Sequence, residues 1–375
     1  MKNLETLIQE LCPDGVEFVK LGEVCVVQRG KRLTKKQLSD SDKFPVFHGG
    51  IQPIGYYSEK NRDANTVMII NVGASAGTIG YSDKEFWSSD GCYCLSHVDS
   101  VVPKYIYYLL ANNQHYFQAK VRHGGIPTLD ALVVKNYEIP LPPIEVQTEI
   151  VRILDKFTSL EAELEAELDC RKRQYEYYRD KLLSFDNVGG QEVEWKKMSE
   201  VCVNCDSKRK AVTGAKRESG NIPYYGASGI VDYVKDYIFD GDYLLVSEDG
   251  ANLLARNTPI AFSIKGKNWV NNHAHVLKFD NLTSQKFVEY YLNSICLSTW
   301  ISGAAQPKLN QENLNRIPIP IPPLAEQHRI VAILDRFESL TTSLQSGLPA
   351  EIAARRQQYE HYRDKLLTFK RKGAV

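Results

Sequence analysis

The chain has 375 residues, with 46 Lys and Arg residues against 46 Asp and Glu residues. This length allows two domains with sizeable cores. The balanced charge excludes nucleic-acid binding through a high net positive charge, so any basic surface must be local. No apolar run approaches the roughly 18 residues of a membrane span, and residues 1–11 lack the pattern of a secretory signal.

The eight cysteines are scattered and show no disulfide framework. Cys202 and Cys205 form one close pair, and Cys92 and Cys94 form another. Neither pair has a second close pair nearby to complete four zinc ligands. We therefore expect small buried thiols in a reducing cytoplasm and no metal site.

The first part of the chain is predicted to be a globular mixture of strands and helices. A short helix is expected over residues 3–11, and the Pro-Asp-Gly turn at residues 13–15 ends it. An entry segment at residues 17–26 leads into a basic loop. A β-rich run at residues 66–71 and an apolar, aromatic helix over residues 103–119 follow.

Residues 139–185 are predicted to contain a long helix. Pro142 and Pro143 stop the preceding segment and suit a helix start, and two tandem Leu-Glu-Ala-Glu tetrads within residues 160–168 favour helix. Apolar residues recur at alternating spacings of three and four: Leu154, Phe157, Leu164, Leu168, Tyr175, Tyr178, Leu182 and Phe185. Such a seam needs a partner helix. The alternative is an ordinary amphipathic helix on its own core.

The long-helix segment occurs twice. IPLPPIEVQTEIVRILDKFTSL at residues 139–160 returns as IPIPPLAEQHRIVAILDRFESL at residues 319–340. YEYYRDKLLSF at residues 175–185 returns as YEHYRDKLLTF at residues 359–369. Self-similarity at this period indicates two copies of a domain-sized unit. The second copy is therefore the expected partner helix.

The regions before the two helices also correspond. Residues 194–203 match the entry segment, residues 243–247 match the β-rich run, and an apolar helix is expected over residues 284–300. The second long helix carries additional residues around Gly347 and Pro349, where we expect it to break.

This organisation predicts an α+β fold in which two globular units of mixed strands and helices are separated by two long helices of a coiled coil. The expected boundaries are 1–140 and 188–320 for the globular units, and 141–187 and 321–375 for the helices.

Loops in both halves carry residues suited to reading DNA. Basic side chains can neutralise phosphates, while Asn, Gln, His, Ser and Tyr can hydrogen-bond base edges. The first-half candidates are Arg29, Lys31, Arg32, Lys35, Lys36, His48, Tyr56, Tyr57, Ser75, Arg122 and His123. The second-half candidates are Lys208, Arg209, Lys210, Arg217, Tyr224, Tyr225, Ser228, Asn252, Arg256, His273, His275, Gln306 and Lys308.

Catalytic motifs are weak. Residues 73–77, GASAG, match a nucleophile elbow, but the β-like residues 78–81 follow where a helix is required. Asp14, Glu17 and Lys20 only loosely match a metal-dependent nuclease. No P-loop or G-x-G-x-x-G motif is present for ATP or S-adenosylmethionine. A self-contained hydrolase or nuclease, using the GASAG loop or an unrecognised site, remains the alternative.

The duplicated IPLPPIEVQTEIVRILDKF and IPIPPLAEQHRIVAILDRF, with RKRQYEYYRDKLLSF and ARRQQYEHYRDKLLTF, resemble the specificity subunit of type I restriction-modification systems. The resemblance covers nearly the whole chain. It implies two target-recognition domains, each reading half of a split DNA sequence, and an antiparallel helical spacer.

The same resemblance implies partners. Two methylation subunits would dock on this subunit and restriction subunits would join them. They would supply S-adenosylmethionine, ATP, Mg²⁺ and the catalytic residues, whereas this chain would have no cofactor. Aromatic residues are enriched at interfaces, so we expect the docking surface to include Tyr175, Tyr177, Tyr178, Tyr359, His361 and Tyr362.

Overall fold

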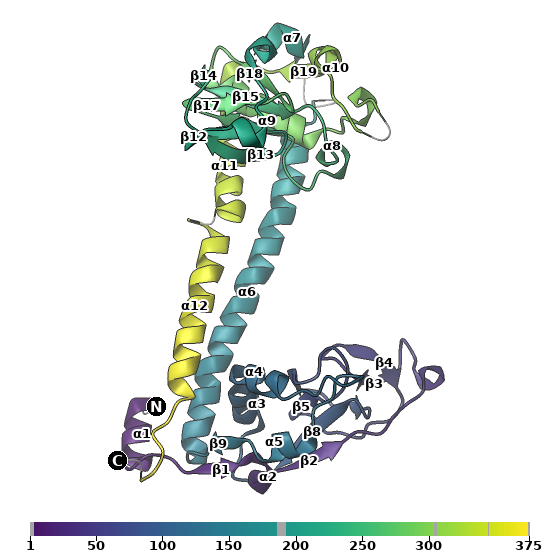
Figure 1. Cartoon of the computed structure of the whole chain (residues 1–375), viewed down its shortest axis with the longest axis vertical. Coiled ribbons are helices and arrows are strands. Elements are labelled where there is room, and N and C mark those ends of the chain that lie inside the picture. The colour runs from purple at the N-terminus through teal and green to yellow at the C-terminus, as the bar shows by residue number, and fades with distance from the viewer. Residues whose placement is uncertain (1–3, 186–192, 304–305, 344, 374–375) are drawn as a thin grey trace. The chain divides into compact units, whose positions relative to one another are not determined.

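The computed structural model describes residues 4–185, 193–303, 306–343 and 345–373. The chain forms two compact units: unit 1 contains residues 1–164 and 352–375, and unit 2 contains residues 165–351. Each unit is an α+β body joined to paired helices, which confirms the predicted fold class (Figure 1). The boundary expected between residues 187 and 188 lies outside the described residues. In the described part of the chain, no helix is long and apolar enough to cross a membrane.

Unit 1 is built on a four-stranded antiparallel sheet with the strand order β2-β8-β5-β6. A second sheet has the order β4-β3-β7, and a third pairs β1 with β9. The elements are α1 (Leu4–Leu11), β1 (Phe18–Lys20), α2 (Leu21–Val24), β2 (Cys25–Arg29), η1 (Lys35–Gln37), β3 (Phe44–Phe47), β4 (Pro53–Tyr57), β5 (Thr66–Ile70), β6 (Ile79–Ser82), β7 (Trp87–Ser88), β8 (Cys92–His97), α3 (Pro103–Asn112), α4 (Gln114–Ala119), α5 (Ala131–Lys135), β9 (Glu138–Pro140) and α6 (Ile144–Leu183).

Unit 2 repeats this topology, with sheets of order β11-β18-β15-β16 and β13-β12-β17-β14 and the pair β10-β19. Its elements, with α12 of unit 1 at the end of the chain, are β10 (Glu194–Lys197), α7 (Met198–Val201), β11 (Val203–Asn204), η2 (Asp206–Lys208), η3 (Gly214–Lys216), β12 (Ser219–Gly226), β13 (Gly229–Val234), β14 (Phe239–Asp240), β15 (Tyr243–Ser247), α8 (Asn252–Ala255), β16 (Ala261–Ile264), β17 (Lys267–Val270), β18 (Ala274–Lys278), α9 (Leu282–Ser294), η4 (Ser298–Trp300), α10 (Gln311–Arg316), β19 (Pro318–Ile321), α11 (Leu324–Thr342) and α12 (Leu348–Leu366).

The central strands are apolar along their length because both of their faces are covered. In β5, Val67 and Ile69 enter the larger core, which also contains residues of α3. Met68 and Ile70 enter a smaller core, to which the strands β3 and β8 also contribute side chains. β15 of unit 2 alternates in the same way between two cores. Each unit is therefore layered as helices, central sheet and second sheet.

In unit 1, the first half of α6 packs antiparallel to α12. Phe157 contacts Tyr359 and Tyr362, and Glu161, one turn further along α6, pairs with Arg356, one turn back along α12. Aromatic packing and one cross-helix ion pair therefore fix the register of this helix pair.

In unit 2, the second half of α6 packs antiparallel to α11, and both Tyr175 and Tyr178 contact Phe337. The second copy of the long helix is interrupted between α11 and α12, where Gly347 adopts φ of +87°. A Cβ at Gly347 would lie 2.5 Å from the carbonyl oxygen of Ser339, so only glycine fits this turn.

Two expected helices are shorter than predicted. The helix expected over residues 103–119 is divided into α3 and α4 at Asn113, whose side-chain amide donates to the Leu109 carbonyl oxygen at 2.9 Å. The helix expected over residues 284–300 ends at Ser294, whose hydroxyl donates to the Tyr291 carbonyl oxygen at 2.8 Å. In both places a short polar side chain competes with the helical backbone hydrogen bonds.

Candidate nucleic-acid interface

In each unit, two loops that carry candidate residues follow strands whose ends lie at the same edge of the four-stranded sheet. β2 and β5 are both antiparallel to β8, so their C-terminal ends lie at the same edge. The loop after β2, which we call the basic loop, carries Lys31, Arg32, Lys35 and Lys36. The loop after β5 carries Ser75. In unit 2, β11 and β15 have the same relation to β18. Sheet topology therefore brings together loops that are distant in sequence.

A tryptophan anchors the basic loop of each unit in the same way. The Trp87 indole N–H donates to the Lys31 carbonyl oxygen at 2.7 Å, and the Trp269 indole N–H donates to the Lys210 carbonyl oxygen at 2.6 Å. Since Trp87 pairs with β3 and Trp269 with β12 in equivalent parallel registers, Lys31 and Lys210 occupy equivalent positions.

The basic loop of unit 1 presents exposed cations. Lys31, Arg32, Lys35 and Lys36 are exposed, and among the described residues none of these four side chains forms an ion pair with a carboxylate. Lys35 and Lys36 lie in η1, which Thr34 and Gln37 close with a capping box. A rigid turn therefore holds unpaired positive charge in solvent, as phosphate binding requires.

Two further loops lie side by side in each unit, and we call them the paired loops: residues 72–77 and 122–128 in unit 1, and residues 249–254 with the described residues 302, 303 and 306–308 in unit 2. The Gly73 N–H donates to the Pro127 carbonyl oxygen at 2.9 Å, and the Gly250 N–H donates to the Pro307 carbonyl oxygen at 3.2 Å. Candidate residues in the paired loops are Ser75, Arg122, His123, Asn252, Gln306 and Lys308.

A pocket of about 420 Å³, which we call the unit 2 pocket, lies beside the first paired loop of unit 2. Four candidates line it, Arg217, Ser228, Asn252 and His273, together with Asp249. His273 Nδ1 lies 2.8 Å from the Asp249 carboxylate, which can accept a hydrogen bond from the ring. A half-exposed histidine, amide, hydroxyl and carboxylate provide both donors and acceptors for a base edge.

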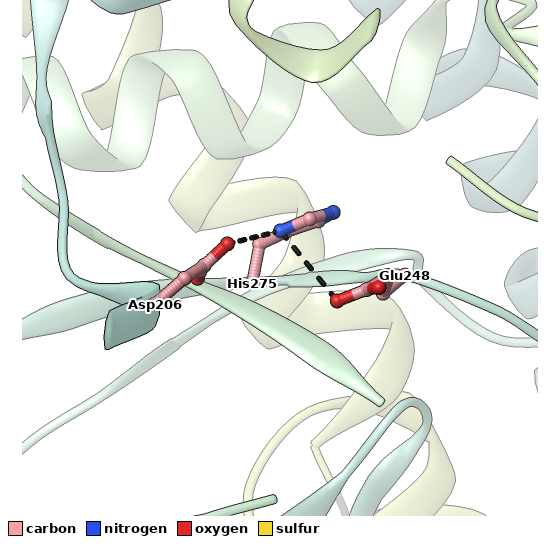
Figure 2. Close-up of side chains that lie close together, drawn as sticks. All are labelled: Asp206, Glu248 and His275. Atoms are coloured by element: carbon pink, nitrogen blue, oxygen red, sulfur yellow. Dashed lines mark hydrogen bonds and ion pairs between the residues drawn. The ribbon is translucent and has the colours of Figure 1, made fainter. Parts of the chain in front are cut away.

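Behind these loops, five charged or titratable residues form a network, of which Figure 2 shows Asp206, Glu248 and His275. His275 is fully buried, and its Nδ1 lies 2.6 Å from Asp206 and 3.9 Å from Glu248. Arg209 pairs with Glu248 at 2.5 Å and with Asp206 at 3.3 Å, and Lys308 pairs with Glu248 at 3.0 Å.

Cations compensate the charge of the two buried carboxylates. Burial alone would raise the pKa of Asp206 and Glu248. The hydrogen bond from His275 to Asp206, and those from Arg209 and Lys308 to Glu248, outweigh burial and hold the pKa of both carboxyls below its ordinary value. Both groups therefore remain ionised inside the protein.

Three residues of this network also have side chains of the types that bind metal ions. The ligand atoms of Asp206, Glu248 and His275 lie within 4.8 Å of one another. However, Arg209 and Lys308 already contact the Glu248 carboxylate, and His275 and Arg209 contact that of Asp206. A cation would have to displace two positively charged side chains, so this network does not fit a metal ion.

Some second-half candidates do not face solvent. His275 and Tyr224 are buried, and the Tyr224 hydroxyl accepts from the Val212 N–H at 3.0 Å, so the prediction that they contact DNA directly is wrong. Arg209 lies in the network. Arg217 covers the Tyr224 ring and pairs with Asp232.

Arg256 has an internal role as well, because its guanidinium donates to the Ile295 carbonyl oxygen at 2.6 Å, just past the C-terminal end of α9. The remaining second-half candidates are at least partly exposed: Lys208, Lys210, Tyr225, Ser228, Asn252, His273, Gln306 and Lys308.

The other first-half candidates are partly ordered by neighbours. His48 Nδ1 lies 3.1 Å from the Ser89 hydroxyl. Tyr57 packs edge-on against Trp87 with ring centroids 5.0 Å apart, and Tyr56 pairs through its backbone with Ser39. Arg29 donates to the Asp90 carbonyl oxygen, and Arg122 pairs with Asp130 at 3.1 Å while keeping most of its side chain exposed.

The hydrolase alternative fails on local structure. Gly73 and Gly77 adopt φ of +89° and +86° and close a tight turn that leads into strand β6, not into a helix. Among the described residues, Ser75 has no side-chain hydrogen bond to a histidine, so no base is placed to activate it.

The aromatic residues on the helices divide into two groups. Tyr175 and Tyr359 are half-buried in the intramolecular seams, and burial raises the pKa of both phenols. Tyr178 and Tyr362 stack on phenylalanines but keep 38% of their surface exposed. Tyr177 and His361 point to solvent.

Sequence reasoning missed the residues that organise the site. The Trp87 and Trp269 anchors could have been found, since both precede a β-rich segment in equivalent positions of the two halves. Asp206 and Glu248 gave no signal, because carboxylates are unexpected beside a DNA surface and the two residues are far apart in sequence.

Comparison with known proteins places both halves in one family. The model of the type I restriction modification DNA specificity domain matches residues 13–169 and again residues 191–354. A type I restriction enzyme specificity subunit of Escherichia coli is 32% identical over 414 residues, covering 100% of this chain and 99% of that protein. One of Haemophilus influenzae is 42% identical over 182 residues, which is 48% of this chain and 47% of that protein.

Solved structures share the fold. The S subunit of a type I restriction-modification system from M. genitalium superimposes with a TM-score of 0.63 at 18% identity, over 94% of this chain and 96% of that one. A chain from a structure of type I system assembly and conformational transition gives a TM-score of 0.56 at 18% identity, over 95% and 98%.

Proposed function

The chain belongs to the family of type I restriction-modification DNA specificity subunits, and from this premise we propose that each of its units reads one half of a split DNA target. The observation that carries the proposal is the duplicated interface: a tryptophan-anchored basic loop and paired loops at one end of the central sheet in both units. Two such units in one chain suit a target of two separated parts.

Within this proposal, the basic loops bind phosphates and the paired loops read bases. Lys31, Arg32, Lys35 and Lys36 in unit 1, with Lys208 and Lys210 in unit 2, carry the phosphate contacts. The unit 2 pocket supplies base-edge contacts through Ser228 and His273. Phosphate contacts fix the position on the duplex, and base contacts supply the sequence information.

The helices are proposed to dock two methylation subunits. Each helix pair carries a groove of about 420 Å³. Five lining positions correspond: Ile153, Phe157, Gln358, Tyr362 and Leu366 in unit 1, and Ile333, Phe337, Gln174, Tyr178 and Leu182 in unit 2. Leu4, Glu5 and Ile8 of α1 also line the groove of unit 1. Two equivalent grooves on one chain suit two copies of one partner.

The chemistry is proposed to belong to the partners. The methylation subunits would hold S-adenosylmethionine, and restriction subunits would use ATP and Mg²⁺. This chain contributes recognition and assembly, in the cytoplasm where those partners and the DNA are.

A methylome of the source cells tests the proposal, because it gives the split target directly. The purified chain with its methylation subunits should then bind duplexes carrying that target more tightly than duplexes with either half scrambled. Equal affinity for all duplexes, or turnover of DNA by the chain alone, would contradict it.

A further inference from the structure

In each unit, a side chain at an equivalent strand position binds the residue that follows the second paired loop. This side chain is a tyrosine in unit 1 and a histidine in unit 2. Tyr93 in β8 and His275 in β18 each follow the first residue of their strand. The Tyr93 hydroxyl donates to the Leu129 carbonyl oxygen at 3.2 Å, and His275 Nε2 lies 2.7 Å from the Leu309 carbonyl oxygen. Each leucine is the residue that directly follows the paired loop.

These leucines also join each loop to the other loop of its pair. The Leu129 N–H donates to the Asn71 carbonyl oxygen at 2.9 Å, and the Leu309 N–H donates to the Glu248 carbonyl oxygen at 2.8 Å. In each unit one side chain therefore helps to fix both loops.

Both ring nitrogens of His275 can donate a hydrogen bond at the same time in only one protonation state, the imidazolium. Nε2 faces a carbonyl oxygen and Nδ1 faces the Asp206 carboxylate at 2.6 Å, so both ring nitrogens have acceptors as partners. A neutral imidazole carries one N–H and can donate to only one of them, whereas the imidazolium donates to both. Donation to Asp206 and to Leu309 at the same time therefore requires the imidazolium; Figure 2 shows the contacts of Nδ1 with Asp206 and Glu248.

The surroundings of His275 suit that charge. Asp206 of η2 and Glu248, which follows β15, are the acidic groups that face the ring. Arg209 and Lys308 face the same carboxylates from the loop after η2 and from the second paired loop. If the ring loses a proton, the remaining N–H favours the carboxylate, the stronger acceptor. The Leu309 carbonyl oxygen then loses its donor.

We propose that protonated His275 is a positioning residue for DNA recognition by unit 2, and that recognition by this unit weakens as pH rises while recognition by unit 1 does not. The inference rests on the proposed function. The charged form holds the loops, so the effect is full at low pH and is lost as pH rises. Unit 1 uses a phenol, which keeps its proton far above the pH at which an imidazolium loses one.

Amide hydrogen exchange on the full wild-type chain gives the first test. Between about pH 6 and about pH 9, a range that extends above the ordinary titration of imidazole, the protection factors of Gly250 and Leu309 should fall about tenfold or more after correction for intrinsic exchange. Those of Gly73 and Leu129, which make the equivalent hydrogen bonds in unit 1, should stay constant. Equal changes in both pairs would overturn the proposal.

DNA binding gives the second test. The chain with its methylation subunits is titrated onto duplexes with the full target, with one half scrambled and with the other half scrambled, at constant salt. The wild-type protein should lose discrimination at one half-site as pH rises. His275→Gln should weaken discrimination at that half-site about tenfold to a hundredfold, the equilibrium effect of a charge-assisted hydrogen bond, and should make it independent of pH.

Two further variants separate positioning from general stability. Tyr93→Phe should weaken discrimination at the other half-site without introducing a pH dependence. His115→Gln alters an exposed histidine of α4 and should keep the wild-type profile. If His275→Gln lowers the melting temperature but leaves both half-site ratios and their pH profiles unchanged, the residue is only structural and the proposal is wrong. If the wild-type complex discriminates neither half-site at any pH, the proposed function itself has failed. If His275→Gln does not fold, the exchange measurement on the wild-type chain decides.

Discussion

Phe337 stacks on Tyr178 with ring centroids 5.7 Å apart and planes inclined by 25°. In the other unit, Phe157 stacks on Tyr362 at 5.7 Å and 24°. The sequence repeat is therefore reproduced in the packing of each helix pair, because each phenylalanine meets a tyrosine from the other copy of the repeat. The two helix segments of each unit stabilise one another through this contact.

Phe157→Ala and Phe337→Ala should each lower the free energy of unfolding by about 1–3 kcal/mol. This loss is smaller than the roughly 3–5 kcal/mol lost when a fully buried phenylalanine is replaced by alanine, because both rings are partly exposed. Thermal denaturation of the full chain measures the effect. Lys172→Ala, which alters an exposed residue of α6, is the control and should melt like the wild-type protein. Equal melting of all variants would show that the stacks contribute nothing.

Lys35→Ala and Lys36→Ala should weaken binding to all DNA sequences alike. Each lost phosphate contact should also reduce the slope of log affinity against log salt by about one. Lys84→Ala, an exposed lysine of the turn after β6, is the matched control and should change neither value. Binding is measured as a salt series on target and non-target duplexes. Loss of affinity for the target alone would assign these lysines to base reading.

Replacing Tyr177 and His361 by alanine should weaken assembly with methylation subunits while the chain remains folded. Both side chains are exposed on the helices, so their loss removes contact area without disturbing a core. Co-elution and sedimentation with the methylation subunit measure the effect. Lys172→Ala on the same helix α6 is the control for an ordinary exposed position. Unchanged assembly of the double variant would remove these two residues from the docking surface.

Unit 2 should lose stability in acid through its buried carboxylates. The pKa of Asp206 is held below its ordinary value, because the hydrogen bond and charge of His275 outweigh the effect of burial. A carboxyl of this kind stabilises the fold above its unfolded pKa, and the stabilisation is lost as pH falls through the folded value. Between about pH 5 and about pH 3, a window set by the ordinary carboxyl pKa, the melting temperature of Asp206→Asn should fall less steeply than that of the wild-type protein. Parallel curves would mean that this carboxyl is not coupled to folding.

Much of the architecture could be predicted because the sequence contains two copies of the same domain-sized unit. The seam through Leu154, Phe157 and Tyr178 identified the paired helices, and the duplication identified each as the partner of the other. Gly347 indicated the interruption between α11 and α12 because only glycine adopts that backbone turn without strain. Features of this kind depend on residues that are close in sequence, so they can be predicted without knowledge of the tertiary structure.

The site was harder to predict from the sequence, because its organisation depends on contacts between residues that are far apart in the chain. His275 looked like an exposed loop residue beside His273, yet the strand β18 alternates and turns His275 into the interior. Arg256 was expected to contact DNA, but its guanidinium donates to the Ile295 carbonyl oxygen just past α9. Residue type alone cannot separate a cation that binds DNA from one that binds its own protein.

The two Leu-Glu-Ala-Glu tetrads of α6 should set the distance between the two DNA half-sites. They occupy residues 160–167, within a helix that is continuous from Ile144 to Leu183. One added tetrad after Leu168 lengthens the helix by about 6 Å and rotates it only about 40° beyond a full turn, so the apolar seam stays nearly in register. At about 3.4 Å per base pair, this is under two pairs. The insertion should therefore lengthen the gap between half-sites by one or two base pairs and leave both half-sites unchanged. Deleting residues 165–168 should shorten the gap by the same amount, which controls for nonspecific damage. Methylome sequencing of cells carrying each variant gives the gap directly. A constant gap, or a changed half-site, would show that α6 does not set the spacing.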